Sequence, residues 1–289
     1  MSVNMSVRIG IIGGSGLYKM GIIDDIEEVK IETPFGASSD MITLGTIHGV
    51  PVAFLPRHGR YHQYPPHMVN YQANIFALKS CGVEFLIATA AVGSLRKKMK
   101  PCDFVIARQL IDRTVSRKNT FFEHDIVAHV GYANPFCKEF SNLAYEIVKS
   151  AKVDVHDGTY LCMQGPQFST RAESELYRSW KADVIGMTLG PEGKLAREAQ
   201  MCLCGILTVT DYDCWFEGED DVSVRSVVEN LKKNDQHLAE IITSLVPRID
   251  GKWECECSKA LENAVITHPD YVKDHVDPRI QQVLLNKKR

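Results

Sequence analysis

Short apolar, β-branched segments alternate with amphipathic segments along this chain, and this alternation is the strongest constraint on its fold. Strands are expected at 8–12, 51–55, 84–92, 103–111, 158–163, 183–187 and 205–210. Helices are expected at 70–81, 134–152, 171–181, 191–203 and 223–247. Strands that alternate with helices from end to end are typical of an α/β fold with a parallel or mixed sheet.

We expect one domain over residues 1–250, followed by a tail. No linker, repeat or low-complexity block interrupts the chain before residue 250, and one α/β domain of that length is common. Residues 251–289 differ in character, because they combine a Cys-x-Cys pair, a His-Pro-Asp turn and a basic end. We interpret this segment as an appended tail or an inter-subunit arm.

Composition and charge exclude several classes of protein. With 45% hydrophobic residues the chain has ample material for a core, which excludes a disordered protein. A net charge of -3 gives no basic excess for a broad nucleic-acid-binding surface. No apolar run approaches the length of a membrane span, and Met1 to Arg8 carry no apolar signal core. We therefore expect a cytoplasmic protein that binds neither nucleic acid nor membrane.

The nine cysteines do not fit that location easily, because cytosolic thiols are normally reduced. Cys202-x-Cys204 and Cys255-x-Cys257 have one residue between the thiols, where zinc sites usually have two to four. We therefore expect no metal. From the residues alone, a catalytic thiol, a structural thiol and a disulfide all stay open.

Two segments at strand ends are candidates for binding an anion. The first strand continues into the glycine-rich turn Gly13-Gly14-Ser15-Gly16, where backbone N–H groups can approach a phosphate closely. A plain structural turn is an equally good interpretation. The second segment is Arg57-His58-Gly59-Arg60, in which arginine could bind phosphate through two N–H groups. The alternative is a solvated basic loop.

Asp211 and Asp213 follow the last apolar strand and are candidates for acid–base chemistry. Residues two apart on a strand point to the same side, so both carboxylates would meet in one pocket. Two close carboxylates push one pKa up and make a proton donor available near neutral pH. The alternative is an Asx-type turn that closes the strand.

Two further pairs could line the same pocket. Met187-Thr188 could supply an apolar surface and a hydroxyl, although a core methionine is the commoner role. Phe168-Ser169 could set an aromatic face beside a hydroxyl, although a proline turn with a core phenylalanine explains it as well. All these candidates lie at predicted strand ends, where α/β folds bind their ligands.

Ordered stretches that cover nearly the whole chain to residue 248 resemble the purine nucleoside phosphorylase superfamily. They are Ile9–Gly16, Thr33–Gly36, Arg57–Arg60, Val69–Ile75, Gly93–Leu95, Gly165–Ser174 and Thr210–Trp215. The resemblance implies a three-layer phosphorylase/hydrolase-like α/β fold, whose mixed, partly barrel-like central sheet is flanked by helices. It also implies a homo-oligomer, either a trimer or a dimer of trimers.

Among the activities of that superfamily, the resemblance is strongest for phosphorolysis of 5′-methylthioadenosine to adenine and 5-methylthioribose 1-phosphate. Adenosine would be a further substrate, and inorganic phosphate would be the co-substrate, with no other cofactor. A broader purine nucleoside phosphorylase, a nucleotide-dependent oxidoreductase and a non-catalytic nucleoside-binding module are the alternatives. The spacing of the glycines argues against the oxidoreductase, because it does not match Gly-x-Gly-x-x-Gly.

The resemblance also implies roles for individual residues. The residues that resemble the phosphate-binding set are Ser15, Arg57, His58, Thr188 and the backbone around Ala91. Those that resemble the nucleoside-binding set are Phe168, Ser169, Met187, Val224, Val227, Val228 and, reaching into a neighbouring subunit, His129. Asp211 and Asp213 resemble the carboxylates that face N7 and the 6-amino group of the purine, with Asp211 as the proton donor.

The tail resembles thiol pairs of heat-adapted archaeal members of the family. Intracellular proteins of such organisms are the recognised exception to the scarcity of cytosolic disulfides. This resemblance leads us to expect oxidised cysteines, with Cys255–Cys257 and Cys137–Cys204 as the first pairs.

Overall fold

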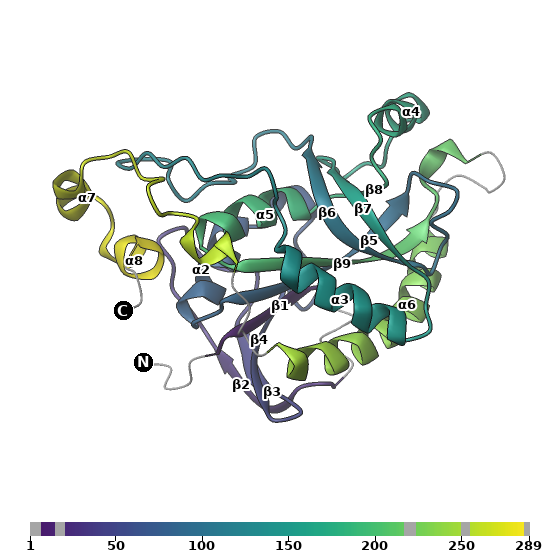
Figure 1. Ribbon diagram of the computed structural model, residues 1–289, viewed down its shortest axis with the longest axis horizontal. Helices are drawn as coiled ribbons and strands as arrows, with labels where there is room; N and C mark the ends of the chain where they lie inside the picture. Colours follow the sequence, from purple (N-terminus) through teal and green to yellow (C-terminus); the bar gives the residue numbers. More distant parts are fainter. Residues whose placement is uncertain (1–6, 15–20, 217–223, 250–254, 286–289) are drawn as a thin grey trace.

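Nine strands in the described part of the chain form one mixed sheet around which the helices pack (Figure 1). The computed structural model describes residues 7–14, 21–216, 224–249 and 255–285. In chain order the strands are β1 (Ile9–Gly13), β2 (Asp24–Val29), β3 (Ile42–Ile47), β4 (Val50–Pro56), β5 (Phe85–Ser94), β6 (Phe104–Asp112), β7 (Val155–Cys162), β8 (Val184–Gly186) and β9 (Cys202–Asp211). Their order across the sheet is β2-β3-β4-β1-β5-β8-β7-β6-β9.

The sheet closes on itself, because β9 pairs with β5 as well as with β6. Strands β5, β8, β7, β6 and β9 therefore form a five-stranded barrel, and β1 to β4 extend from β5 as an open sheet. Neighbouring strands run parallel at β1–β4, β1–β5 and β5–β9, and antiparallel at β5–β8 and β6–β9. The expectation of a mixed, partly barrel-like α/β sheet is confirmed.

Two layers of helices cover the sheet, one on each face. Successive side chains along a strand point to opposite faces, so a single strand packs against both layers. Ile11 packs in the cluster that includes α3 (Lys138–Ser150) and α6 (Val224–Leu245). Its neighbour Ile12 packs in the opposite cluster, with α2 (Tyr71–Ser80) and α5 (Leu189–Glu198). Figure 1 shows these pairs of helices on opposite sides of β1, β5 and β9. Both faces of the central strands are buried, so their sequences are continuously apolar.

Two helix boundaries differ from the predicted ones. The helix expected at 134–152 begins at Lys138, because Cys137 and not Asn134 occupies its N-cap position. The helix expected at 191–203 is α5, which ends at Glu198. The chain is already extended at Cys202, where β9 begins and pairs with Phe85. In both cases tertiary pairing sets the boundary and overrides the local cap signal.

Strands β2 and β3 did not emerge from the apolar pattern. β2 has the sequence Asp-Asp-Ile-Glu-Glu-Val and forms the edge of the sheet, with its first four residues exposed. Acidic residues are depleted in strands in general but are suited to an edge, where charge discourages pairing with another chain. The remaining predicted strands and the helix α4 (Arg171–Ser179) lie close to their predicted ranges.

The described part of the tail consists of short helical turns that pack on the domain. They are η4 (Glu256–Lys259), α7 (Pro269–His275), α8 (Pro278–Ile280) and η5 (Gln281–Leu285). Val272, Val276 and Leu284 are buried in the cluster that includes α2 and α5. That the tail also acts as an inter-subunit arm stays a prediction.

The expected disulfides are absent from the structure, which describes all nine cysteines as free thiols. The pairing of Cys137 with Cys204 is wrong, because the Cys137 thiol gathers with those of Cys202, Cys255 and Cys257. Cys255 and Cys257 lie in that same cluster without a bond between them. Cys202, and not Cys204, belongs to the group of four thiols that includes Cys137.

Among the described residues, no helix combines the length and the apolar character that crossing a membrane requires.

Gly205 on β9 tests how tightly the barrel packs against α5. A Cβ at this position would lie 2.9 Å from Leu189 Cδ2 and 3.0 Å from Ala107 Cβ. We expect Gly205→Val to lower the free energy of unfolding by about 1–3 kcal/mol, because an overpacked core forces side chains out of their preferred rotamers. Gly131→Val is the control, since a Cβ there meets no atom within 4 Å. Equal urea midpoints for the two variants would contradict the packing described here.

Candidate active site

A pocket of about 400 Å³ opens where β1, β4, β5, β8 and β9 end. Eight of the predicted site residues line it, namely Arg57, His58, Ala91, Phe168, Met187, Thr188, Asp211 and Asp213. Gly14 of the glycine-rich turn lines it too. A larger hollow of about 900 Å³ lies between the start of α2, the loop 116–125 and the tail. None of the predicted site residues lines that hollow, so the chemistry points to the smaller pocket.

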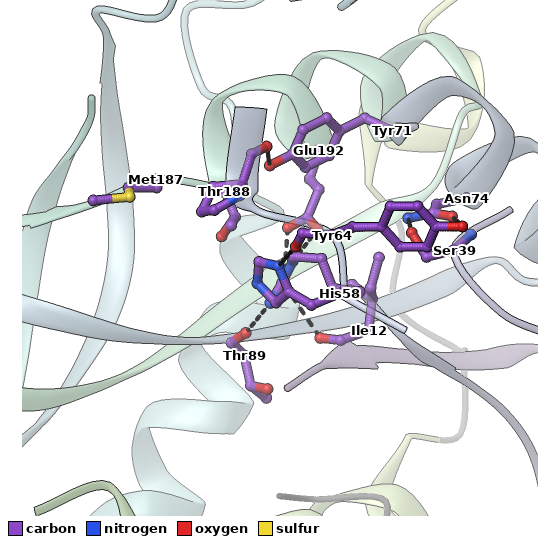
Figure 2. Close-up of polar contacts among 12 residues, drawn as sticks. Ile12, Ser39, His58, Tyr64, Tyr71, Asn74, Thr89, Met187, Thr188 and Glu192 are labelled. Carbon is purple, nitrogen blue, oxygen red and sulfur yellow. Dashed lines mark hydrogen bonds and ion pairs between the residues drawn. The ribbon is translucent and has the colours of Figure 1, made fainter. Parts of the chain in front are cut away.

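Arg57 sits under the pocket in a buried ion pair with Glu192 of α5. Both side chains are almost inaccessible, at 2% and 0% exposure. Nε donates to one carboxylate oxygen of Glu192, and an Nη2 N–H donates to the other at 3.0 Å. Figure 2 shows the further partners, the carbonyls of Thr89 and Ile12, at 2.9 and 3.5 Å. Four of the five guanidinium N–H groups are thereby used within the protein, which leaves one on Nη1 for the pocket.

Glu192 therefore orients Arg57 and sets its charge. Burial by itself would lower the pKa of Arg57, but the Glu192 carboxylate outweighs that effect and holds the pKa above its ordinary value. The guanidinium is thus a fixed positive charge at the bottom of the pocket. The sequence predicts that Arg57 binds phosphate through two N–H groups. In the structure, the carboxylate of Glu192 accepts two hydrogen bonds from Arg57.

His58 lies beside Arg57 as a neutral imidazole. Its Nδ1 is 2.8 Å from the Tyr64 carbonyl, which requires the proton on Nδ1 and leaves Nε2 as an acceptor. Burial, the neighbouring Arg57 charge and His62 lower the pKa of His58 to about 4. His62 stacks on the ring with centroids 4.5 Å apart. At neutral pH, therefore, His58 is uncharged and its Nε2 can accept a hydrogen bond from a ligand.

Thr188 is the N-cap residue of α5 but does not cap it. Its hydroxyl is buried and has no hydrogen-bond partner among the described residues, although the side chain lines the pocket. The backbone N–H is held by the Tyr160 hydroxyl at 3.1 Å. A buried hydroxyl without a partner costs stability, and at a helix N-terminus it is well placed to donate to an anionic ligand.

Asp211 and Asp213 meet at the other end of the pocket, as the spacing predicts. The Asp211 carboxylate accepts hydrogen bonds from the Asp213 N–H and the Thr210 hydroxyl, both at 2.8 Å. Asp213 is buried, and the hydroxyl of Ser174 on α4 donates to it at 2.6 Å. Its φ of 51° is in the left-handed region, which Asp tolerates better than most residues and which turns its side chain into the pocket.

One of the two carboxyls has a raised pKa, and the neighbouring carboxylate is not the main cause. It is Asp213 whose pKa is raised, and burial is the main cause. Hydrogen bonds from Ser174 and Ser169 oppose this rise only in part. The raised pKa makes Asp213 easier to protonate than an exposed aspartate.

Strand β5 runs along the pocket, from Arg57 at one end to the carboxylate pair at the other. The Thr89 carbonyl holds Arg57, whereas Gly93 packs against the carboxylate pair, where a Cβ would lie 2.9 Å from Asp211 Oδ1. Four residues along a strand span about 13 Å. The distance between the Arg57 end and the carboxylate end of the pocket is therefore large enough to hold a sugar.

Of the remaining predicted site residues, some line the pocket and others do not. Phe168 lines the pocket with its side chain half exposed, and Met187 lines it as well. Ser169 is not in the pocket wall, although its hydroxyl contacts Asp213. His129 lies away from the pocket, where its N–H bonds to Ala264 of the tail.

Four predicted site residues cannot be placed. Ser15 lies outside the described residues. Val224, Val227 and Val228 belong to the first turns of α6, but their side chains lie outside the described part. Further along α6, Leu238 and Asp235 line the pocket, so the helix does reach the site.

Glu192 is the functional residue that the sequence reasoning missed. It lies 135 positions from Arg57, and no spacing rule links the two. The one available signal was an acid that directly follows Pro191 at the start of a predicted helix. Asp235 and Leu238 were missed because a 25-residue amphipathic pattern does not show which turn faces a pocket.

The profile of the phosphorylase superfamily matches residues 8–247. The chain belongs to this superfamily. An S-methyl-5′-thioadenosine phosphorylase of Nitrosopumilus maritimus is 49% identical over 89% of this chain and 98% of its own length. The protein of that name from Geobacter sulfurreducens is 47% identical over 97% and 99%.

Solved structures of superfamily members share the fold. A methylthioadenosine phosphorylase from an antarctic soil metagenomic library is 43% identical over 97% of this chain and 100% of its own, with a TM-score of 0.92. The methylthioadenosine phosphorylase of Schistosoma mansoni, in complex with adenine, is 35% identical over 91% and 99%, with a TM-score of 0.84.

The buried pair of this superfamily member gives a test of how Arg57 is held. We expect Glu192→Gln to lower the free energy of unfolding by about 3–5 kcal/mol, because it leaves the buried guanidinium without a counter-charge. The double variant Arg57→Met/Glu192→Leu removes both charges, so it should recover much of that loss. Urea denaturation of the three proteins measures both effects. A Glu192→Gln variant as stable as the parent would show that the pair carries no such role.

Proposed function

We propose that this protein catalyses the phosphorolysis of S-methyl-5′-thioadenosine to adenine and 5-methylthioribose 1-phosphate. One observation carries the proposal: a single pocket has a fixed positive charge and an unpartnered hydroxyl at one end and two carboxylates at the other. The spacing along β5 leaves room for a ribose between phosphate and purine. The activity named for the relatives above fits this arrangement.

At the anion end, phosphate is held by the remaining Arg57 N–H, the Thr188 hydroxyl and backbone N–H groups near Gly14 and Ala91. Ser15, which follows Gly14, belongs to the same set. His58 accepts a hydrogen bond from the O–H of the monoprotonated phosphate through Nε2, since its own proton is on Nδ1. The phosphate oxygen that points toward the sugar stays unencumbered and serves as the nucleophile.

At the carboxylate end, the purine lies against Phe168, and Met187 lies under the ribose. The bond from C1′ to N9 breaks as a phosphate oxygen bonds to C1′, and the purine leaves with the electron pair. A proton on Asp211 moves to N7 and neutralises the leaving base. The negative phosphate stabilises the cationic sugar between the two ends.

Asp213 selects the base. Its carboxylate accepts a hydrogen bond from a 6-amino group, whereas a 6-oxo group would face a second acceptor. The Ser174 and Ser169 hydroxyls hold Asp213 in place. Burial raises the pKa of Asp213, whereas a hydrogen bond from a 6-amino group favours its ionised form.

The 5′-methylthio group is assigned to the start of α6, with Val224, Val227 and Val228 as its apolar surroundings. An apolar surface rejects a hydroxyl only weakly, so adenosine is the second candidate substrate. A solved relative from Schistosoma mansoni is named an adenosine/methylthioadenosine phosphorylase. We also propose that the chain works as a trimer or a dimer of trimers, in which His129 completes a neighbour's site.

The deciding experiment is adenine release from S-methyl-5′-thioadenosine with and without inorganic phosphate. We expect release only with phosphate, together with formation of the sugar phosphate. Asp211→Asn should lower kcat by about 10²–10⁴-fold, because it removes the proton donor. Asp213→Asn should move the preference from adenosine toward inosine. Release without phosphate would indicate a hydrolase, and no release from any nucleoside would favour a binding module.

Thr188 separates phosphate binding from folding. We expect Thr188→Val to raise the KM for phosphate by roughly tenfold or more, because a hydrogen bond to an anion contributes about 1.5–3 kcal/mol. Stability in the absence of phosphate should be equal or higher, since the variant loses a buried unpartnered hydroxyl. Steady-state kinetics and urea denaturation measure the two quantities.

Thr43 offers a matched control on β3. Its hydroxyl is also buried without a partner among the described residues, but it does not line the pocket. Thr43→Val should therefore leave the KM for phosphate unchanged. If Thr43→Val and Thr188→Val changed that KM equally, the phosphate site would not be at Thr188.

A further inference from the structure

Four thiols converge on one point at the end of the barrel away from the pocket. Cys137 precedes α3, Cys202 opens β9, and Cys255 and Cys257 come from the start of the tail. Their sulfur atoms all lie within 4.8 Å of one another. Three segments that are far apart in the sequence thus contribute to a single cluster.

The spacing of the sulfurs matches a metal centre better than disulfides. Four sulfurs about 2.3 Å from a tetrahedral zinc ion lie about 3.8 Å apart. A disulfide needs about 2.05 Å, and Cys202 and Cys255 are 3.1 Å apart, too far for that bond and somewhat closer than across an occupied zinc site. Two disulfides would also divide the cluster into pairs, but here all four sulfurs are mutual neighbours. We propose that Cys137, Cys202, Cys255 and Cys257 form a structural zinc site.

The surroundings suit a structural ion. Cys137, Cys202 and Cys257 are at most 6% exposed, and Cys255 is partly buried against the same apolar cluster. Four protein ligands complete a tetrahedron and leave no position for water or substrate, as in structural zinc sites. Cys137 is the N-cap residue of α3, a 13-residue helix, which fixes one of the four sulfurs at the end of a regular element.

The site is remote from the reaction. Cys202 and Asp211 are the first and last residues of β9, which places them about 30 Å apart along the strand. The proposed ion therefore fastens the start of the tail to β9 and α3 and leaves the chemistry of the pocket untouched. The spacing rule missed it because only two ligands are close in sequence, and they are separated by one residue.

Cys204 provides a matched control. It is buried, lies two residues further along β9, and is not a member of the cluster. It contacts Ser141, which lies one helical turn beyond Cys137 on α3. A serine at 204 therefore changes a buried thiol of the same strand without removing a ligand.

The test measures metal and thiols in the full-length protein purified without oxygen. After removal of metal, addition of Zn²⁺ and dialysis, we expect about one zinc per chain by elemental analysis. Denaturation with a chelator should then release nine titratable thiols. Co²⁺ in place of Zn²⁺ should give the visible bands of a tetrahedral tetrathiolate.

The variants locate the site. Cys202→Ser and the more exposed Cys255→Ser should lose the retained zinc and unfold at a lower temperature, with adenine release at ambient temperature preserved. Cys204→Ser should retain zinc as the parent does. Failure of the parent to retain zinc, two or four thiols fewer than nine, or equal zinc loss in Cys204→Ser would each overturn the proposal. Cys255→Ser keeps the test valid if Cys202→Ser does not fold.

Discussion

The parallel pairing of β5 with β9 runs in register from Phe85 opposite Cys202 to Val92 opposite Val209. Much of the site depends on it. It closes the barrel, and the register shift after Val92 sets Gly93 opposite Asp211. Because Gly93 lacks a side chain, the carboxylate pair can approach the strand closely. The same strand presents the Thr89 carbonyl to Arg57, so one rigid element fixes both ends of the pocket.

The two ends of the pocket are unfavourable for folding in different ways. At one end Arg57 needs Glu192 to be buried as a charge, and Thr188 buries a hydroxyl without a partner. At the other end Asp213 is buried enough to raise its pKa. Each of these groups is costly to bury, and the structure offsets the cost for Arg57 and Asp213 with Glu192 and Ser174. The pocket thus concentrates buried polar groups that the apolar core around it does not contain.

The sequence was informative where local rules govern the structure. The buried strands are continuously apolar, and Asp211 and Asp213 are two apart at a strand end, so both could be predicted. The partner of Arg57 could not, because Glu192 comes from a helix 135 residues away. β2 was not predicted, because its acidic residues suit an exposed edge strand and the prediction relied on buried, apolar strands. The disulfide prediction was wrong for the reason that also hid Glu192. The cysteine cluster joins three segments that are far apart in the sequence.

β9 links the active site to the cysteine cluster. Its last residue, Asp211, belongs to the carboxylate pair, and its first, Cys202, belongs to the four-thiol cluster. Between them the strand is buried on both faces and paired to β5 and β6. A metal at the first end would add stability where no substrate binds, which offsets the polar groups buried at the other end. The stabilising site and the reacting site would then lie at opposite ends of one strand. The polar groups buried in the pocket and the four cysteines that would bind the metal are not in contact.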